Sequence, residues 1–74
     1  MSFEDLLEQG QRALDADDSR QALKLLQQAI GLQQTAHAWQ LLAEAQLDEN
    51  HLLKAKKSIS AGLNMEPENI DLLY

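Results

Sequence analysis

Residues 36–67 read AHAWQLLAEAQLDENHLLKAKKSISAGLNMEP, and this stretch decides the fold. It contains two runs rich in Leu and Ala, which are strong helix formers, separated by the polar segment Asp-Glu-Asn-His. Thr35 can cap a first helix that reaches to about Asp48. Asn50 can adopt the left-handed conformation that a tight corner needs. With a second helix over about 51–64, the stretch predicts a hairpin of two antiparallel helices.

The same pattern occurs a second time, earlier in the chain, under a 33-residue shift of the sequence against itself. This shift pairs small residues with small ones and large apolar residues with large apolar ones. The pairs are Gly10 with Ala43, Ala22 with Ala55, Ala29 with Gly62, Leu6 with Trp39, Leu26 with Ile59 and Ile30 with Leu63. Two helices can approach closely where a side chain is nearly absent, so matched small residues indicate matched helix packing.

The remaining boundaries follow from local signals. We expect helices from residue 3 to about 16 and from residue 19 to 31 or 32, because apolar residues recur there at helical spacing. The segment Asp-Ala-Asp-Asp-Ser at 15–19 supplies turn and cap residues, and Gly31 is a stop signal for the second helix. A turn at 64–69 and the start of a fifth helix at 70–74 complete the prediction. The fold class is all-α, with about four full helices plus a short C-terminal helical turn, in one domain over 1–74.

Composition excludes several classes of protein. The 74 residues contain no Cys, so neither a disulfide nor a thiolate–zinc site can stabilise the domain. We expect no membrane span, because no apolar run approaches the roughly 20 residues that one needs. The acidic start Met-Ser-Phe-Glu-Asp lacks the layout of a signal peptide, so we expect a cytoplasmic protein. The net charge of -6 argues weakly against nucleic acid as the main ligand.

No pattern of residues indicates catalysis. The sequence has no nucleophile–base pair, glycine-rich phosphate loop or carboxylate dyad, so we expect that the protein is not an enzyme. His37 and His51 are widely separated along the chain, and neither has a third ligand at helical spacing. We therefore expect no metal and no cofactor.

The segment 36–67 resembles a tetratricopeptide repeat (TPR). The opening W-x-x-L-G pattern of that family is matched by Trp39, Leu42 and Ala43. Its later conserved positions are matched by Ala55, Ile59 and Gly62, and its closing L-x-L-D-P is matched by Leu63 to Pro67. The segment 3–35 is similar but departs from the pattern, since it has Gln9 where Leu is usual and lacks the closing Pro. The resemblance implies one repeat over about 3–35, a second over about 36–69 and the start of a third at 70–74.

The resemblance also implies a short right-handed stack of hairpins whose first helices line a concave groove. The family binds peptides or partner domains there, and its core aromatic position falls on Trp39, which we expect to pack inside. None of the groove positions Leu7, Gln11, Gln40, Leu41 and Glu44 is basic, so we expect no clamp for a peptide carboxylate. The candidate groove residues are Leu7, Gln11, Leu14, His37, Gln40, Glu44 and Asp48.

Charge is distributed unevenly over the predicted helices. The first and third carry acids, whereas the second and fourth carry none and hold five of the six basic residues. One interpretation is an acidic groove that steers a basic or amphipathic segment of a protein partner; the simpler one is that solvated faces carry charge. Two further functions stay open. Copies could self-associate into a homo-oligomer, because the unfinished third repeat leaves an apolar flank on 36–64, or the lysines at 54, 56 and 57 could contact nucleic acid.

Overall fold

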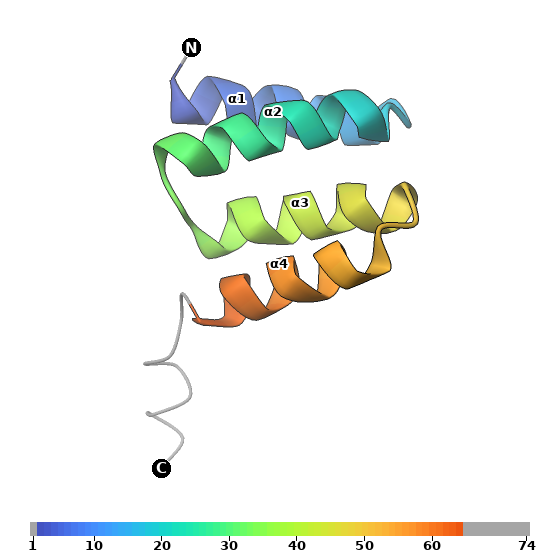
Figure 1. The fold of residues 1–74 in the computed structure, drawn as a ribbon. Helices are drawn as coiled ribbons and strands as arrows, with labels where there is room; N and C mark the ends of the chain where they lie inside the picture. The colour runs from blue at the N-terminus through green and yellow to red at the C-terminus, as the bar shows by residue number, and fades with distance from the viewer. Residues whose placement is uncertain (1, 65–74) are drawn as a thin grey trace.

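The computed structural model describes residues 2–64, in which four α-helices are joined by three short corners. The helices are α1 (Phe3–Asp15), α2 (Ser19–Leu32), α3 (Ala36–Asp48) and α4 (Leu52–Asn64). Each runs antiparallel to the helix before it (Figure 1). The predicted all-α fold is confirmed. The turn expected at 64–69 and the helical turn expected at 70–74 lie outside the described residues, apart from Asn64 itself.

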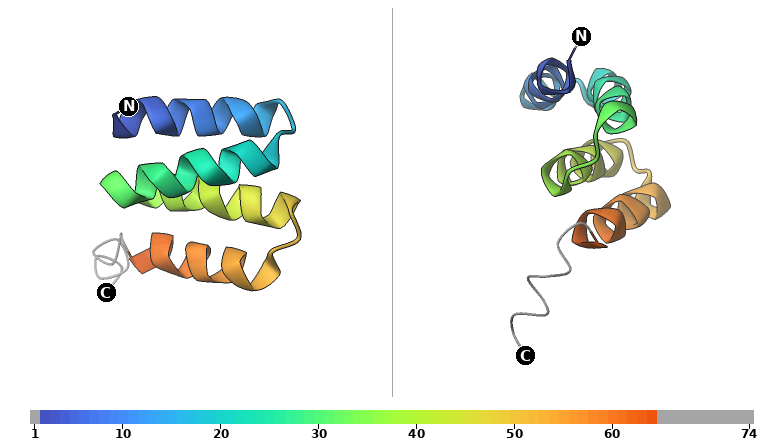
Figure 2. Two further views of the ribbon diagram at one scale, coloured as in Figure 1. Left: turned by 45° about the horizontal axis from the view of Figure 1, so that its top comes forward. Right: turned by 90° about the vertical axis from the view of Figure 1, so that its left-hand side faces the viewer.

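Two hairpins form and stack on each other. α1 packs on α2 and α3 packs on α4, while α2 contacts α3 and so joins the hairpins, and α1 also touches α3. Figure 2 shows the two pairs one above the other. This stacking buries a cluster shared by α2 and α3, and a second cluster lies between α1 and α2.

Side-chain caps begin three of the helices at the positions where they are needed. Ser2, Asp18 and Thr35 each accept a hydrogen bond from the backbone N–H three residues on, at 3.2, 3.3 and 3.1 Å. Each cap satisfies one of the N–H groups that a helix N-terminus leaves without an internal partner. The predicted cap at Thr35 and the cap expected within 15–19 are therefore confirmed.

The corners of the two hairpins have the same geometry, one repeat apart. Asp17 and Asn50, which occupy equivalent positions, both have φ of 61°. The N–H groups of Asp17 and Asp18 bond to Leu14 and Ala13, and those of Asn50 and His51 bond to Leu47 and Gln46. This pair of bonds is the Schellman arrangement, which closes a helix with a left-handed residue. The predicted left-handed conformation of Asn50 is confirmed.

α2 ends at Leu32, within the predicted range, but Gly31 does not end it. Gly31 lies inside the helix without a positive φ, and the cap is Gln33 in extended conformation. The chain leaves α2 toward the next hairpin instead of reversing at a tight corner, so a left-handed glycine is not required there.

Small residues bring the helices of the first hairpin together, as the repeat predicts. Ala22, Leu26 and Ala29 of α2 are completely buried. A Cβ atom on Gly10 of α1 would lie 2.7 Å from Cγ and Cδ2 of Leu26, so only glycine fits at this crossing. Trp39 is half-buried and packs against the core, as expected for the family's aromatic position.

Candidate functional site

The four predicted groove residues of α3 form one exposed stripe. His37, Gln40, Glu44 and Asp48 are all exposed. Their spacings of three and four residues bring them to the same side of the helix. The opposite side of α3 is buried in the core, so this stripe and the exposed Leu47 beside it are the part of α3 that a ligand can reach most easily.

The three predicted positions on α1 divide into two kinds. Gln11 is exposed, whereas Leu7 and Leu14 are half-buried and pack against a core cluster that contains Leu41 and Ala45 of α3. These two leucines therefore help to join α1 to α3, and they offer a ligand only part of their surface. Leu41 is 6% exposed and packs in the core, although the family pattern placed it at a groove position.

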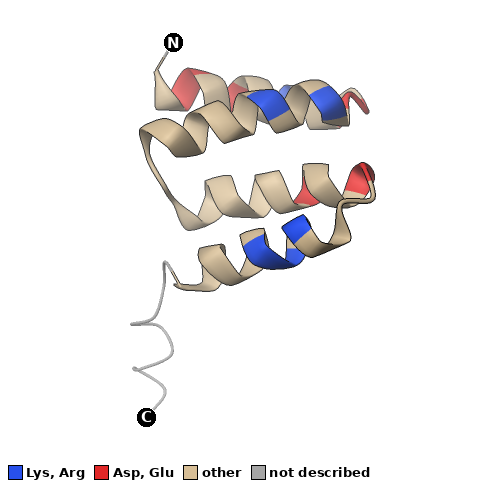
Figure 3. Cartoon of the chain, viewed as in Figure 1, with Lys and Arg blue, Asp and Glu red and all other residues tan. Residues whose placement is uncertain are grey.

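The charge division expected from the sequence follows the helices. Acidic side chains lie on α1 and α3, and basic ones lie mainly on α2 and α4 (Figure 3). Within residues 2–64, Arg12 is the one basic residue outside α2 and α4, and it pairs with Glu8 at 2.6 Å on the same helix. The acids of α1 and α3 thus share neighbouring helices, with little opposing charge between them.

One acidic side chain serves the contact between the hairpins. Glu49, at the corner after α3, accepts a hydrogen bond from the Ser19 hydroxyl, and its second oxygen lies 3.5 Å from Nε of Arg20. The Ser19 hydrogen bond, with further contributions from Arg20 and His51, lowers the pKa of Glu49 against a smaller opposing effect of desolvation. This carboxylate fixes the end of α3 to the start of α2, and it is a structural group.

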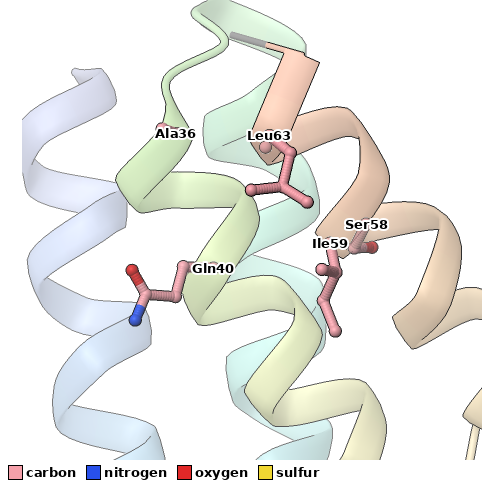
Figure 4. Close-up of a pocket in the computed structure, with 6 residues that line it drawn as sticks. Ala36, Gln40, Ser58, Ile59 and Leu63 are labelled. Carbon is pink, nitrogen blue, oxygen red and sulfur yellow. The ribbon is translucent and has the colours of Figure 1, made fainter. Parts of the chain in front are cut away.

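A pocket of about 260 Å³ opens between α3 and α4. Figure 4 shows Ile59 and Leu63 of α4 on the side toward α3, whereas the side chain of Gln40 points away from them. We call this surface the end face, and the residues that line it are Ala36, Gln40, Ser58, Ile59, Gly62 and Leu63. Ile59 and Leu63 are 46% and 64% exposed, which leaves large apolar side chains open to water. Gln40 thus belongs both to the stripe on α3 and to the end face.

The predicted site residues did not include the end-face residues of α4. A signal for them was present in the sequence, because the 33-residue shift pairs Ile59 and Leu63 with Leu26 and Ile30 of α2. Those two residues pack against the next hairpin, whereas α4 has no further hairpin beyond it within the described residues.

A buried polar pair lies close to the end face. The Ser58 hydroxyl donates a hydrogen bond of 2.6 Å to Oε1 of Gln46, and both side chains are almost completely buried. The bond joins α4 to α3 and satisfies both groups inside the second hairpin.

Neither a cluster of metal ligands nor a membrane-spanning helix occurs in the part of the chain that the structure describes. Among residues 2–64, no three His, Asp or Glu side chains come close enough together to hold a metal ion. No helix in that range combines the length and the apolar character needed to cross a membrane.

Taken together, the described residues define an all-α protein of two stacked helical hairpins with two open surfaces. Comparison of the chain with protein-family models, curated proteins and solved structures finds no match.

Proposed function

We propose that this protein is a non-catalytic protein-interaction module of the TPR type, an adaptor or assembly factor. On this proposal it binds a basic or amphipathic segment along the first helices of its two repeats. The observation that carries the proposal is the exposed stripe on α3, in which Glu44 and Asp48 present two carboxylates next to the acidic α1.

Electrostatics supports this choice of partner. Glu4 and Asp15 of α1 stand one repeat before His37 and Asp48 of the stripe. Their carboxylates add to the negative field of the stripe, and the basic α2 and α4 do not neutralise it locally. Such a field raises the association rate of a positively charged segment more than it raises the final affinity. Exposed Gln11 and Gln40 supply hydrogen-bonding groups beside the carboxylates.

The test is capture of partners from the native cell by the intact chain and by two charge variants. Glu44→Gln with Asp48→Asn removes two charges from the stripe, and Lys54→Gln with Lys57→Gln removes two from α4 as the matched control. We expect the first pair to reduce capture and the second to leave it unchanged. Equal capture by both variants, or capture that is insensitive to salt, would contradict the proposal.

Self-association remains an alternative prediction, and one observation argues against its head-to-tail form. Such stacking would place α1 of one copy on the end face of another, in the way that α3 sits on the first hairpin. At the positions equivalent to Ala38, Leu41, Leu42 and Ala45 of α3, α1 carries the exposed residues Asp5, Glu8, Gln9 and Arg12. This polar side would bring almost no apolar surface to the end face.

A further inference from the structure

The first hairpin shows what the end face is shaped to hold. There, α3 lies on α1 and α2 and buries Ala38, Leu41, Leu42 and Ala45. The surface that receives it includes Leu26 and the half-buried Leu7 and Ile30. A helix with apolar residues at i, i+3, i+4 and i+7 therefore fits this kind of surface.

The end face is the same surface, one repeat later. The positions one repeat after Leu7, Leu26 and Ile30 are Gln40, Ile59 and Leu63, and all three line the pocket between α3 and α4. Leu26 is completely buried beneath α3, whereas Ile59 is 46% exposed, because no described helix covers it. The second hairpin thus repeats a helix-receiving surface that is left open within residues 2–64.

The end face differs in charge from the surface of the first hairpin on which α3 packs. Lys56 stands one repeat after the apolar Leu23, which packs against the core beneath α3, so Lys56 borders the end face. Lys54 and Lys57 stand one repeat after Gln21 and Lys24, which stay exposed beside α3, so they lie on another side of α4. All three lysines are exposed, and none forms an ion pair within residues 2–64. α4 contains no acid that could compensate them. A helix that docks here gains if it carries acidic residues beside its apolar stripe.

These observations indicate what kind of molecule binds at the end face. A second copy would bring either its own α4, with the same Lys56, or its α1, with a polar side at the required positions. Neither offers an apolar stripe bordered by acids. A partner with that chemistry fits both the pocket and Lys56.

We propose that the end face docks an amphipathic helix of another protein, with an apolar stripe flanked by Asp or Glu. The helix lies antiparallel to α4, as α3 lies antiparallel to α2, and its apolar side chains cover Ile59 and Leu63. Its acids face Lys56. This site is separate from the acidic stripe on α3, except that Gln40 touches both, and it selects partners of the opposite charge.

The test uses two synthetic helical peptides of about 15 residues. Both carry Leu or Ala at i, i+3, i+4 and i+7; one has Glu at the flanking positions and the other has Lys. Neither contains Trp, so the single tryptophan of the full chain, Trp39, reports binding by fluorescence. Trp39 is a suitable reporter because its Cβ lies only 3.2 Å from where a Cβ on Gly62 of the end face would stand.

We expect the Glu peptide to bind at least about fivefold more tightly than the Lys peptide, in a salt-dependent manner. Lys56→Glu should lower the affinity for the Glu peptide by about fivefold. The same charge reversal on α2, Lys24→Glu, should leave that affinity unchanged. Ile59→Asp should abolish binding without loss of helicity by circular dichroism, because Ile59 is already half-exposed.

Three results would overturn the proposal. Equal affinity for the two peptides would show that Lys56 does not select the bound helix by charge. The Glu peptide could fail to bind while sedimentation equilibrium shows a dimer that Ile59→Asp dissociates. That result would assign the end face to a second copy of the chain. Binding that appears only after Leu72→Asp and Leu73→Asp in the full chain would show that residues of the same chain occupy the face.

Discussion

Gly10 of α1 and Leu26 of α2 are in such close approach that a Cβ atom on Gly10 would lie 2.7 Å from two carbons of the leucine side chain. Leu26 is completely buried and cannot swing aside into solvent. We expect Gly10→Ala to destabilise the protein by about 1–2 kcal/mol, because overpacking outweighs the gain in helix propensity of roughly 0.5–1 kcal/mol. Urea unfolding followed by circular dichroism measures the change.

Gly31 is the matched control for that substitution. It is exposed within α2, and an added Cβ meets nothing within 4 Å. Gly31→Ala should therefore stabilise the protein by about 0.5–1 kcal/mol through helix propensity alone. If both glycine variants changed the free energy of unfolding in the same direction, the close approach at Gly10 would not be the cause.

The hydrogen bond between Ser58 and Gln46 predicts an asymmetric pair of effects. Ser58→Ala leaves Oε1 of Gln46 buried without its donor, and we expect a loss of about 1–3 kcal/mol. Adding Gln46→Met removes the unpaired acceptor and should recover part of that loss. Chemical denaturation of the single and double variants gives the coupling energy, and Ser60→Ala, at an exposed site on the same helix, is the control. Simple additivity of the two substitutions would contradict this account.

The corner residue Asn50 predicts opposite effects for two small replacements. Its φ of 61° lies in the left-handed region, where an Ala side chain costs about 1 kcal/mol and glycine costs nothing sterically. We expect Asn50→Ala to lower the melting temperature and Asn50→Gly to leave it unchanged or raise it slightly. Asp17 has the same φ at the equivalent corner, so the same two replacements there should give the same order.

The Ser19–Glu49 contact predicts a specific dependence of stability on pH. Because the folded protein lowers the pKa of Glu49, the contact contributes its full stability above the pKa that Glu49 has in the unfolded chain. That contribution is lost as pH falls through the lower pKa of the folded state, so the window lies below the ordinary Glu pKa of about 4.3. Arg20 and His51 add to the lowering, and desolvation opposes it.

Comparison with Glu49→Gln isolates this contribution from the other carboxylates. The variant should be less stable than the parent at neutral pH, and the difference should shrink as the solution is acidified through that window. Glu44→Gln, on the exposed stripe, is the control and should show no such convergence. A difference for Glu49→Gln that is constant with pH would refute the assignment.

We expect the half-buried Trp39 to tolerate replacement by phenylalanine. Its Nε1 is buried without a hydrogen-bond partner among residues 2–64, so Trp39→Phe removes an unsatisfied donor while it keeps an aromatic ring in the core. We expect a loss of no more than about 1.5 kcal/mol, against about 3–5 kcal/mol for Trp39→Ala. Thermal unfolding by circular dichroism distinguishes the two, and similar losses would show that the N–H group matters more than the ring.

Local sequence signals determined the four helices and most of their ends. Thr35 predicted a cap and Asn50 a left-handed corner, and both are confirmed because these features depend on a few neighbouring residues. The prediction that Gly31 ends α2 is wrong, because a glycine can lie inside a helix as well as end one. The way α2 ends is set by the direction of the chain toward the next hairpin, which is not a local property.

The 33-residue repeat went further and predicted which residues pack together. Small residues at matched positions indicated where helices approach, and the contact of Gly10 with Leu26 follows that pattern. The sequence also indicated the exposed stripe on α3, because residues three and four apart share one side of a helix.

Tertiary structure alone decided which of these surfaces are covered. Leu26 and Ile59 are equivalent in the sequence, yet the first is completely buried and the second is half-exposed. The difference arises because α3 lies on the first hairpin, whereas no described helix lies on the second. Whether an apolar side chain belongs to a core or to a docking surface depends on the element packed against it, and residue type does not encode that.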